Sequence, residues 1–119
     1  MTPNIFDSEL RVMDILWQAG DITAKEIASQ LSEQVGWSKT TTYTVIKKCI
    51  DKGLIERRGS DFLCHALISK VQVRERETME LVDKMFDGSS DQLVASLISN
   101  NQISPQQLQE LRKLLEGLE

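Results

Sequence analysis

The stretch GWSKTTTYTVIKKCIDKGLIERRGS, residues 36–60, decides the fold. Its first part predicts a helix, because Ser38 can act as an N-cap for the first turn and Gly53 provides a left-handed stop. At about 100° per residue, this helix has two distinct faces. The apolar face consists of Thr42, Val45, Ile46, Cys49 and Ile50. The opposite face carries Thr40, Thr44, Lys47, Lys48 and Asp51, with Thr41 at its edge.

The polar face has the groups by which a helix contacts DNA. Hydroxyls near the helix N-terminus can reach base edges or phosphates, and lysines further along can reach phosphates. Residues 54–67, LIERRGSDFLCHAL, then form two short extended runs around Gly59, which predicts a hairpin with two arginines at its tip. This is the outline of a winged helix-turn-helix. The candidate DNA-binding residues are Ser38, Lys39, Thr40, Thr41, Thr44, Lys47, Lys48, Arg57, Arg58 and Ser60.

Length and composition limit the class of protein. With 119 residues, the chain can hold one domain, or a small domain with an appendage. No apolar run approaches the roughly twenty residues of a membrane span, and the N-terminus lacks a secretory signal pattern. The two cysteines, Cys49 and Cys64, are interpreted as buried residues of a reduced protein. We therefore expect a cytoplasmic protein with no membrane partner.

The net charge of −4 argues against nucleic acid at first, but its distribution changes the conclusion. Residues 36–60 carry six basic and two acidic residues, a net charge of +4. The segments before and after them each carry −4. One basic segment between acidic flanks is a localised electrostatic footprint for DNA. The overall acidity should weaken non-specific binding, which suits a protein that holds its site with two linked copies.

Two further helices precede the basic one. Asp7 is expected to cap a helix over residues 8–19, whose apolar rows belong at the back of the core. The TAKE sequence at 23–26 has the reciprocal capping pattern and opens a second helix to about Glu33. Trp37, in the following turn, is interpreted as a core residue in preference to a base-stacking platform.

Residues 69–119 predict three amphipathic helices. They open at Ser69, at Ser89 or Ser90, and at Ser104, and Asn100–Asn101 break the second from the third. We assign residues 1–68 to a winged helix-turn-helix DNA-binding domain and residues 69–119 to a helical dimerisation region. The predicted fold class is therefore mainly α with a small β-hairpin wing.

The C-terminal helices carry apolar stripes that need a partner. About fifty residues are too few for an independent core, and a second copy related by a two-fold axis is the expected partner. The alternative is a monomer in which these helices fold back onto the winged domain. The candidate dimerisation residues are Met79, Val82, Met85, Phe86, Leu93, Val94, Leu97, Ile98, Leu108, Leu111, Leu114 and Leu115.

No catalytic or cofactor motif is visible, so we expect no enzyme activity, cofactor or metal. The chain has one histidine, His65, and Cys64 beside it on the same strand would point to the opposite face. A zinc site needs three or four convergent ligands. The sequence also lacks a glycine-rich phosphate loop and a serine elbow.

In the order of its motifs, the chain resembles the penicillinase-repressor (BlaI/MecI/CopY-like) family of bacterial winged-helix regulators. The matching pieces are SELRVMDILW at 8–17, TAKEI at 23–27, WS at 37–38, Thr41, Thr44, KGLI at 52–55, ALIS at 66–69, FDGS at 86–89, LV at 93–94 and ISPQQLQELRKLL at 103–115. The resemblance implies a homodimer that binds an operator dyad through its wing and recognition helix, with interlocking C-terminal helices.

Several positions depart from the family pattern. Members often read WSPKT after the turn, whereas Thr40 here stands where a lysine is usual, and DFLCH replaces a common arginine–aromatic–x–tyrosine strand. Antibiotic-responsive members are cut between an asparagine and a phenylalanine, but here Asn101 follows Asn100. These two residues are the candidate proteolysis point, and a regulatory protease is a candidate partner. The copper-sensing branch is disfavoured, because no cysteine follows Cys64.

The predicted function is a sequence-specific DNA-binding transcriptional repressor that acts as a homodimer on a palindromic operator. The alternative is a winged-helix protein–protein interaction module that binds no DNA. The threonine and lysine face of the third helix favours the first function, because a protein-binding helix would more often carry apolar or acidic residues there.

Overall fold

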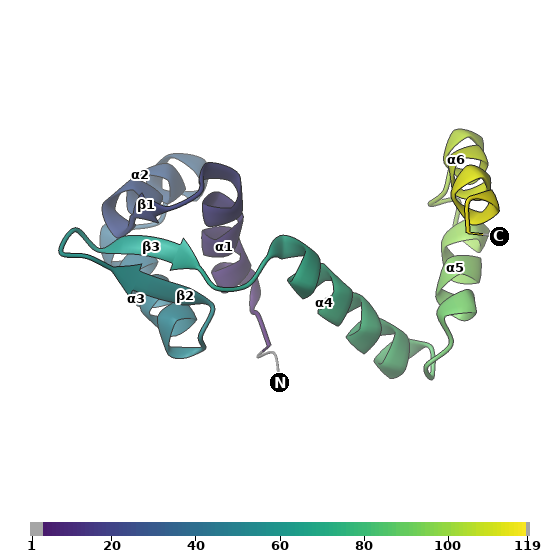
Figure 1. Ribbon diagram of the computed structural model, residues 1–119, viewed down its shortest axis with the longest axis horizontal. Helices are drawn as coiled ribbons and strands as arrows, with labels where there is room; N and C mark the ends of the chain where they lie inside the picture. The colour runs from purple at the N-terminus through teal and green to yellow at the C-terminus, as the bar shows by residue number, and fades with distance from the viewer. Residues whose placement is uncertain (1–3, 119) are drawn as a thin grey trace. The chain divides into compact units, whose positions relative to one another are not determined.

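The computed structural model describes residues 4–118 and is mainly helical, with one small antiparallel sheet (Figure 1). The elements in chain order are α1 (Asp7–Ala19), β1 (Ile22–Thr23), α2 (Ala24–Val35), α3 (Lys39–Asp51), β2 (Ile55–Arg58), β3 (Leu63–Ala66), α4 (Lys70–Met85), α5 (Ser90–Ser99) and α6 (Pro105–Glu116). The predicted class, mainly α with a hairpin wing, is confirmed. The chain divides into two compact units, with the boundary inside α4 between Arg76 and Glu77.

The first unit is built around a core that α1, α2 and α3 share with the sheet. The buried apolar residues of this core are Val12, Met13, Ile15, Leu16, Ala24, Ile27, Leu31, Val45, Ile46, Cys49, Leu54, Ile55 and Cys64. On α3 the predicted inner face is confirmed, because Thr42 is also buried and Ile50 packs against the core. Trp37 packs against the same core, as expected. The burial of this face turns the polar face of α3 outward.

Local sequence signals set both ends of α3. The Ser38 hydroxyl accepts a hydrogen bond from the backbone N–H of Thr41 at 3.1 Å, as predicted for an N-cap. After the last turn, Gly53 adopts a φ of 78°, and the Leu54 N–H donates to the Cys49 carbonyl at 2.9 Å. This is a Schellman termination, which needs the left-handed conformation that glycine adopts without steric cost.

The starts of α1 and α2 differ in detail from the sequence prediction. Asp7 is the first residue of α1 and not its cap; Phe6 occupies the cap position. The carboxylate of Glu9 accepts a hydrogen bond from the Phe6 N–H at 2.9 Å, which satisfies one of the free backbone donors at this helix start. Thr23 caps α2 as predicted, but Glu26 accepts from the Thr23 hydroxyl at 3.2 Å.

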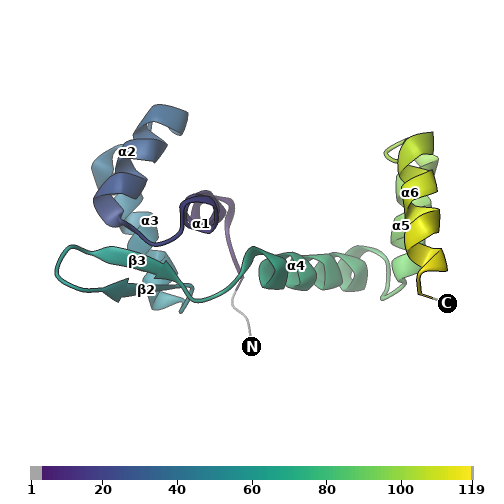
Figure 2. The same cartoon turned by 45° about the horizontal axis from the view of Figure 1, so that its top comes forward.

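The sheet has three strands in the order β1–β3–β2, and both pairings are antiparallel. In the longer pairing Ile55 lies opposite Ala66 and Arg58 lies opposite Leu63, so residues 59–62 form the hairpin turn. The hairpin lies beside α3 in two views, and its turn extends away from α1 (Figures 1 and 2). The sequence predicted this hairpin but not the two-residue strand β1.

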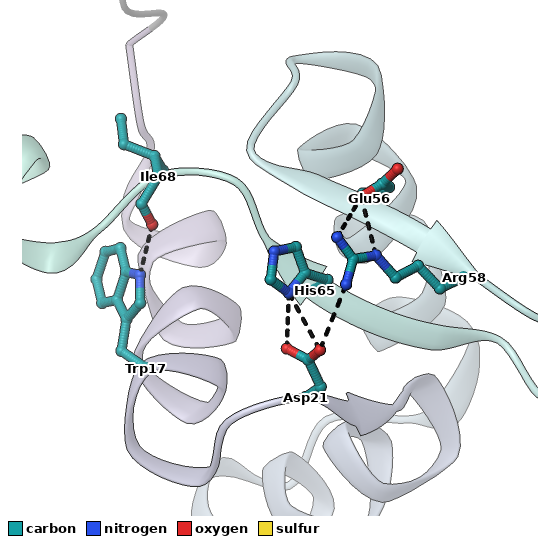
Figure 3. A network of polar contacts seen from close by, with 6 residues as sticks. All are labelled: Trp17, Asp21, Glu56, Arg58, His65 and Ile68. Atoms are coloured by element: carbon teal, nitrogen blue, oxygen red, sulfur yellow. Dashed lines mark hydrogen bonds and ion pairs between the residues drawn. The ribbon is translucent and has the colours of Figure 1, made fainter.

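The first half of α4 is anchored to the first unit by polar contacts. The indole Nε1 of Trp17 donates to the Ile68 carbonyl at 2.9 Å just before this helix (Figure 3). Ser69 and Gln72 form the predicted reciprocal cap. Lys70 then pairs with Asp14 at 3.3 Å, and Val73 is buried. The charged start of α4 is thus compatible with packing in the first unit.

The second unit comprises the rest of α4 together with α5 and α6. Asp87 and Gly88, with φ values of 51° and 80°, follow the end of α4, as the sequence predicted. Ser104 caps α6, and the Gln107 side chain completes the reciprocal box at 2.8 Å. Asn101, with a φ of 58°, separates the two helices. Within residues 4–118 no helix is both long and apolar enough to span a membrane.

Candidate nucleic-acid interface

The exposed face of α3 brings together most of the candidate DNA-binding residues. The exposed residues here are Ser38, Lys39, Thr40, Thr41, Thr44, Lys47 and Lys48. Two of the hydroxyl protons are already used inside the helix. Ser38 donates to the Thr41 hydroxyl and Thr44 donates to the Thr40 carbonyl, both at 2.9 Å. Each acceptor oxygen on Thr41 and Thr44 retains lone pairs, which suit the amino donors of cytosine and adenine in the major groove.

Tyr43 belongs to this face, although the sequence prediction omitted it. It lines an open groove of about 400 Å³ together with Lys39, Thr40, Thr44 and Lys47. The Lys39 ammonium lies 5.6 Å from the centre of the tyrosine ring. The helical spacing could have found this residue, because Tyr43 stands four positions from both Lys39 and Lys47.

The two arginines of the wing have different surroundings. Arg57 lies over the Phe62 ring, with 4.0 Å between the guanidinium carbon and the ring centre. Arg58 forms an ion pair with Glu56 at 3.0 Å and lies 3.9 Å from Asp21 (Figure 3). Successive residues of a strand point to opposite faces of the sheet, which explains why the Arg57 and Arg58 side chains have different neighbours. Both arginines are exposed at the end of β2, and Ser60 is exposed in the turn.

The carboxylate of Asp21 joins this wing network to the turn after α1. His65 Nδ1 lies 2.9 Å from one Asp21 oxygen and 3.1 Å from the other (Figure 3). Neither Asp21 nor this contact was predicted, because the two residues come together only in the folded unit. In the part of the chain that the structure describes, no group of three or more histidine, cysteine or carboxylate residues could hold a metal ion.

The core behind the interface contains both cysteines, and each is reduced and buried. Burial raises the pKa of the Cys49 thiol to about 12, and the nearby Glu9 carboxylate acts in the same direction. Burial also raises the pKa of Cys64 to about 11, against the opposing charge of Arg57. Both side chains are therefore neutral thiols near pH 7 and poor nucleophiles.

The candidate dimerisation residues are mostly exposed in a single chain. Val82 is buried, while Phe86, Leu93 and Leu108 are half-buried. The others are between 38% and 69% exposed: Met79, Met85, Val94, Leu97, Ile98, Leu111, Leu114 and Leu115. Large apolar side chains exposed in such number on three neighbouring helices of the chain are typical of an interaction surface.

A helix-turn-helix with an adjacent β-hairpin and an outward-facing polar third helix defines the winged-helix class. The chain belongs to the penicillinase repressor family, because the family model described as "Penicillinase repressor" matches residues 5–117.

Two curated relatives cover nearly the whole chain. The penicillinase repressor of Bacillus licheniformis is 28% identical over 116 residues, which are 96% of this chain and 91% of that protein. The methicillin resistance regulatory protein MecI of Staphylococcus aureus strain N315 is 26% identical, over 96% of this chain and 94% of that protein.

A solved structure is similar to the winged part. It is the monomeric form of Bacillus licheniformis BlaI in complex with the blaP half-operator, with 30% sequence identity and a TM-score of 0.52. The match covers 60% of this chain and 90% of that chain.

Proposed function

We propose that the protein is a sequence-specific DNA-binding transcriptional repressor that works in the cytoplasm. The observation that carries this proposal is the outward face of α3, where acceptor hydroxyls stand beside lysines on the side opposite the core. The family membership supports it, and so does the half-operator bound by the similar BlaI domain. The net charge of +4 in residues 36–60 gives the electrostatic attraction to phosphates.

Within this interface we assign the contacts by chemistry. Thr41 and Thr44 would read base edges, because their oxygens keep acceptor lone pairs. Lys47 and Lys48 would bind phosphates, as would Arg57 on the wing. Ser38, Lys39, Thr40 and Ser60 would complete the surface at the helix start and the hairpin turn. Arg58 is the least available of the predicted residues, because two carboxylates already surround it.

We also propose that two copies of the chain bind a palindromic operator together. The exposed apolar residues of α4, α5 and α6 would be buried by a second copy. Joining two winged domains makes binding at the second half-site an intramolecular event, with an effective concentration that can reach the millimolar range. The half-sites should then lie on one face of the duplex, about one helical turn or a multiple apart.

A regulatory protease is the proposed partner that would end repression. Asn100 and Asn101 are exposed and follow the last turn of α5, where the Asn101 N–H donates to the Ile98 carbonyl at 3.1 Å. Cutting between them would separate α6 from the rest of the chain and weaken the dimer. An engineered cleavage site at this bond should therefore convert the protein to monomers by sedimentation. A stable dimer after complete cutting would contradict this role.

The DNA-binding proposal is tested by the different effects of Thr44→Ala and Lys48→Ala. The probes are a duplex selected by the unchanged protein from a random library and a scrambled duplex of equal length, with binding measured by fluorescence anisotropy. Lys48→Ala should weaken binding to both duplexes alike and lower the salt slope by about one. Thr44→Ala should cost about 1–3 kcal/mol on the selected duplex only. The matched control is Arg11→Ala, which removes an exposed basic side chain of α1. It should change neither the affinity for the two duplexes nor the salt slope.

Two outcomes would contradict the proposal in different ways. If the two variants weakened both duplexes by equal factors, base reading by α3 would be wrong. If the unchanged protein bound neither duplex at low salt, the protein–protein interaction module would be favoured.

A further inference from the structure

Phe62 occupies an unusual position in the hairpin turn. Its φ is 54°, in the left-handed region that bulky side chains rarely adopt and that costs about 1–2 kcal/mol for residues other than glycine. Its carbonyl accepts a hydrogen bond from the Ala24 N–H at 3.0 Å, which ties the turn to the start of α2. A strained backbone conformation persists only where surrounding contacts stabilise it, and such residues often lie at functional sites. The contacts of the Phe62 side chain therefore indicate its role.

The ring of Phe62 contacts both DNA-facing elements. On one side the Arg57 guanidinium lies 4.0 Å from its centre. On the other side the Tyr43 ring of α3 meets it edge-on, with centroids 5.8 Å apart and an interplanar angle of 79°. Lys39 in turn lies over the Tyr43 ring at 5.6 Å. Two aromatic rings between two cations thus form a continuous connection from the wing to the recognition helix.

This connection distinguishes the two wing arginines. A guanidinium held over a ring face keeps its N–H edges available for a phosphate, because the ring interacts with the positive charge and not with the donors. The Arg58 guanidinium instead donates to Glu56 at 3.0 Å and lies near Asp21. The wing therefore presents Arg57, whose guanidinium lies over the same ring that contacts Tyr43 of α3.

We propose that Phe62 is a positioning residue, which holds the wing arginine Arg57 against the recognition helix so that phosphate binding and base reading occur in one fixed geometry. This inference rests on the proposed DNA-binding function and deepens it. It assigns a role to the pair Phe62 and Tyr43, which bind no phosphate in this scheme but align the groups that do.

A purely structural role in the turn leads to a different expectation. Asparagine adopts left-handed conformations more easily than phenylalanine, so Phe62→Asn suits the backbone of the turn but removes the ring. If Phe62 only closed the turn, Phe62→Asn would leave the contribution of Arg57 to DNA binding unchanged. If it positions Arg57, that contribution should fall, whatever happens to stability.

The experiment is a double-mutant cycle on the selected duplex. Arg57→Ala should weaken binding at least about tenfold in the unchanged background, the loss expected for one charged hydrogen-bonded contact. In the Phe62→Asn background the same substitution should cost less than about twofold, since coupled residues are not additive. Phe62→Asn alone should lower the salt slope by about one, as Arg57→Ala does. Phe62→Tyr, which keeps an aromatic ring, should retain the affinity and the salt slope of the unchanged protein.

The controls separate this inference from the function on which it rests. Phe62→Leu keeps an apolar side chain without a ring, and it serves as the second variant if Phe62→Asn does not fold. Independent, multiplicative losses for Arg57 and Phe62, or an unchanged salt slope in both ring-free variants, would overturn the positioning role while leaving DNA binding intact. Failure of the unchanged protein to bind the duplex would overturn the proposed function and this inference with it.

Discussion

Replacing Glu9 or Lys52 should destabilise the first unit, by amounts that differ in a predictable order. The Glu9 side chain is completely buried, and its Oε1 lies 2.6 Å from the Lys52 ammonium at the end of α3. Lys52 is 26% exposed and also donates to the Asn4 carbonyl at 3.0 Å, and it lies 4.0 Å from the Phe6 ring. The pair therefore joins the start of α1 to the end of the recognition helix.

The structure indicates which substitution costs more. Lys52→Met leaves a carboxylate buried without its cation, and breaking a buried pair in this way costs about 3–5 kcal/mol. After Glu9→Ala, the partly exposed Lys52 ammonium keeps contact with water, the Asn4 carbonyl and the Phe6 ring. We therefore expect a smaller loss of stability, about 2–3 kcal/mol. The double variant Glu9→Leu with Lys52→Met should cost least, because an apolar pair of similar volume removes the desolvation penalty.

Urea unfolding followed by tryptophan fluorescence measures these losses, because both tryptophans, Trp17 and Trp37, lie in the first unit. The midpoint should fall at unchanged m-value, which reports stability alone. Glu33→Ala, an exposed carboxylate of α2, is the control and should change stability by less than about 0.5 kcal/mol. A Lys52→Met loss equal to that of the control would refute the assignment of a buried ion pair.

Two further predictions concern the core and the C-terminal helices. Because burial raises the pKa of Cys49 to about 12 and that of Cys64 to about 11, the contribution of these two thiols to stability should be constant at pH values below their unfolded pKa of about 9. Above it, the unfolded thiols ionise first, so each thiol should remove about 1.4 kcal/mol per pH unit up to its folded pKa. At pH 8 a thiol reagent should modify the native protein far more slowly than the urea-unfolded protein, and equal rates would contradict the burial. Leu97→Asp combined with Leu111→Asp should yield a monomer by sedimentation, since buried unpaired carboxylates cost several kcal/mol each; a stable monomer of the unchanged protein at micromolar concentration would reject the dimer.

Local sequence signals predicted α3 well, because its limits depend on neighbouring residues. Ser38 and Gly53 set its ends through contacts within one turn, and the helical period separates its two faces. The same logic located the wing and the caps at Thr23 and Ser104. The DNA-binding, dimerisation and proteolysis assignments stay predictions.

The sequence patterns did not predict the contacts between residues that are distant in the chain. The two arginines look equivalent in the sequence ERRG. Of the two, Arg58 is the one described near Asp21, and Arg57 is the one described over the Phe62 ring. Strand β1 was too short to carry a periodic signal, and its pairing with β3 spans some forty residues of chain. The left-handed backbone conformation of Phe62 was not predicted either, because turn patterns favour glycine and asparagine at such positions.

Selection of duplexes from a random library by the unchanged protein tests the central claim most directly. A dimeric repressor that reads bases through α3 should enrich an inverted repeat, with half-sites about one helical turn or a multiple apart. The same protein carrying Leu97→Asp and Leu111→Asp should no longer require both half-sites. Enrichment of no sequence, or of a single site without two-fold symmetry, would contradict the account.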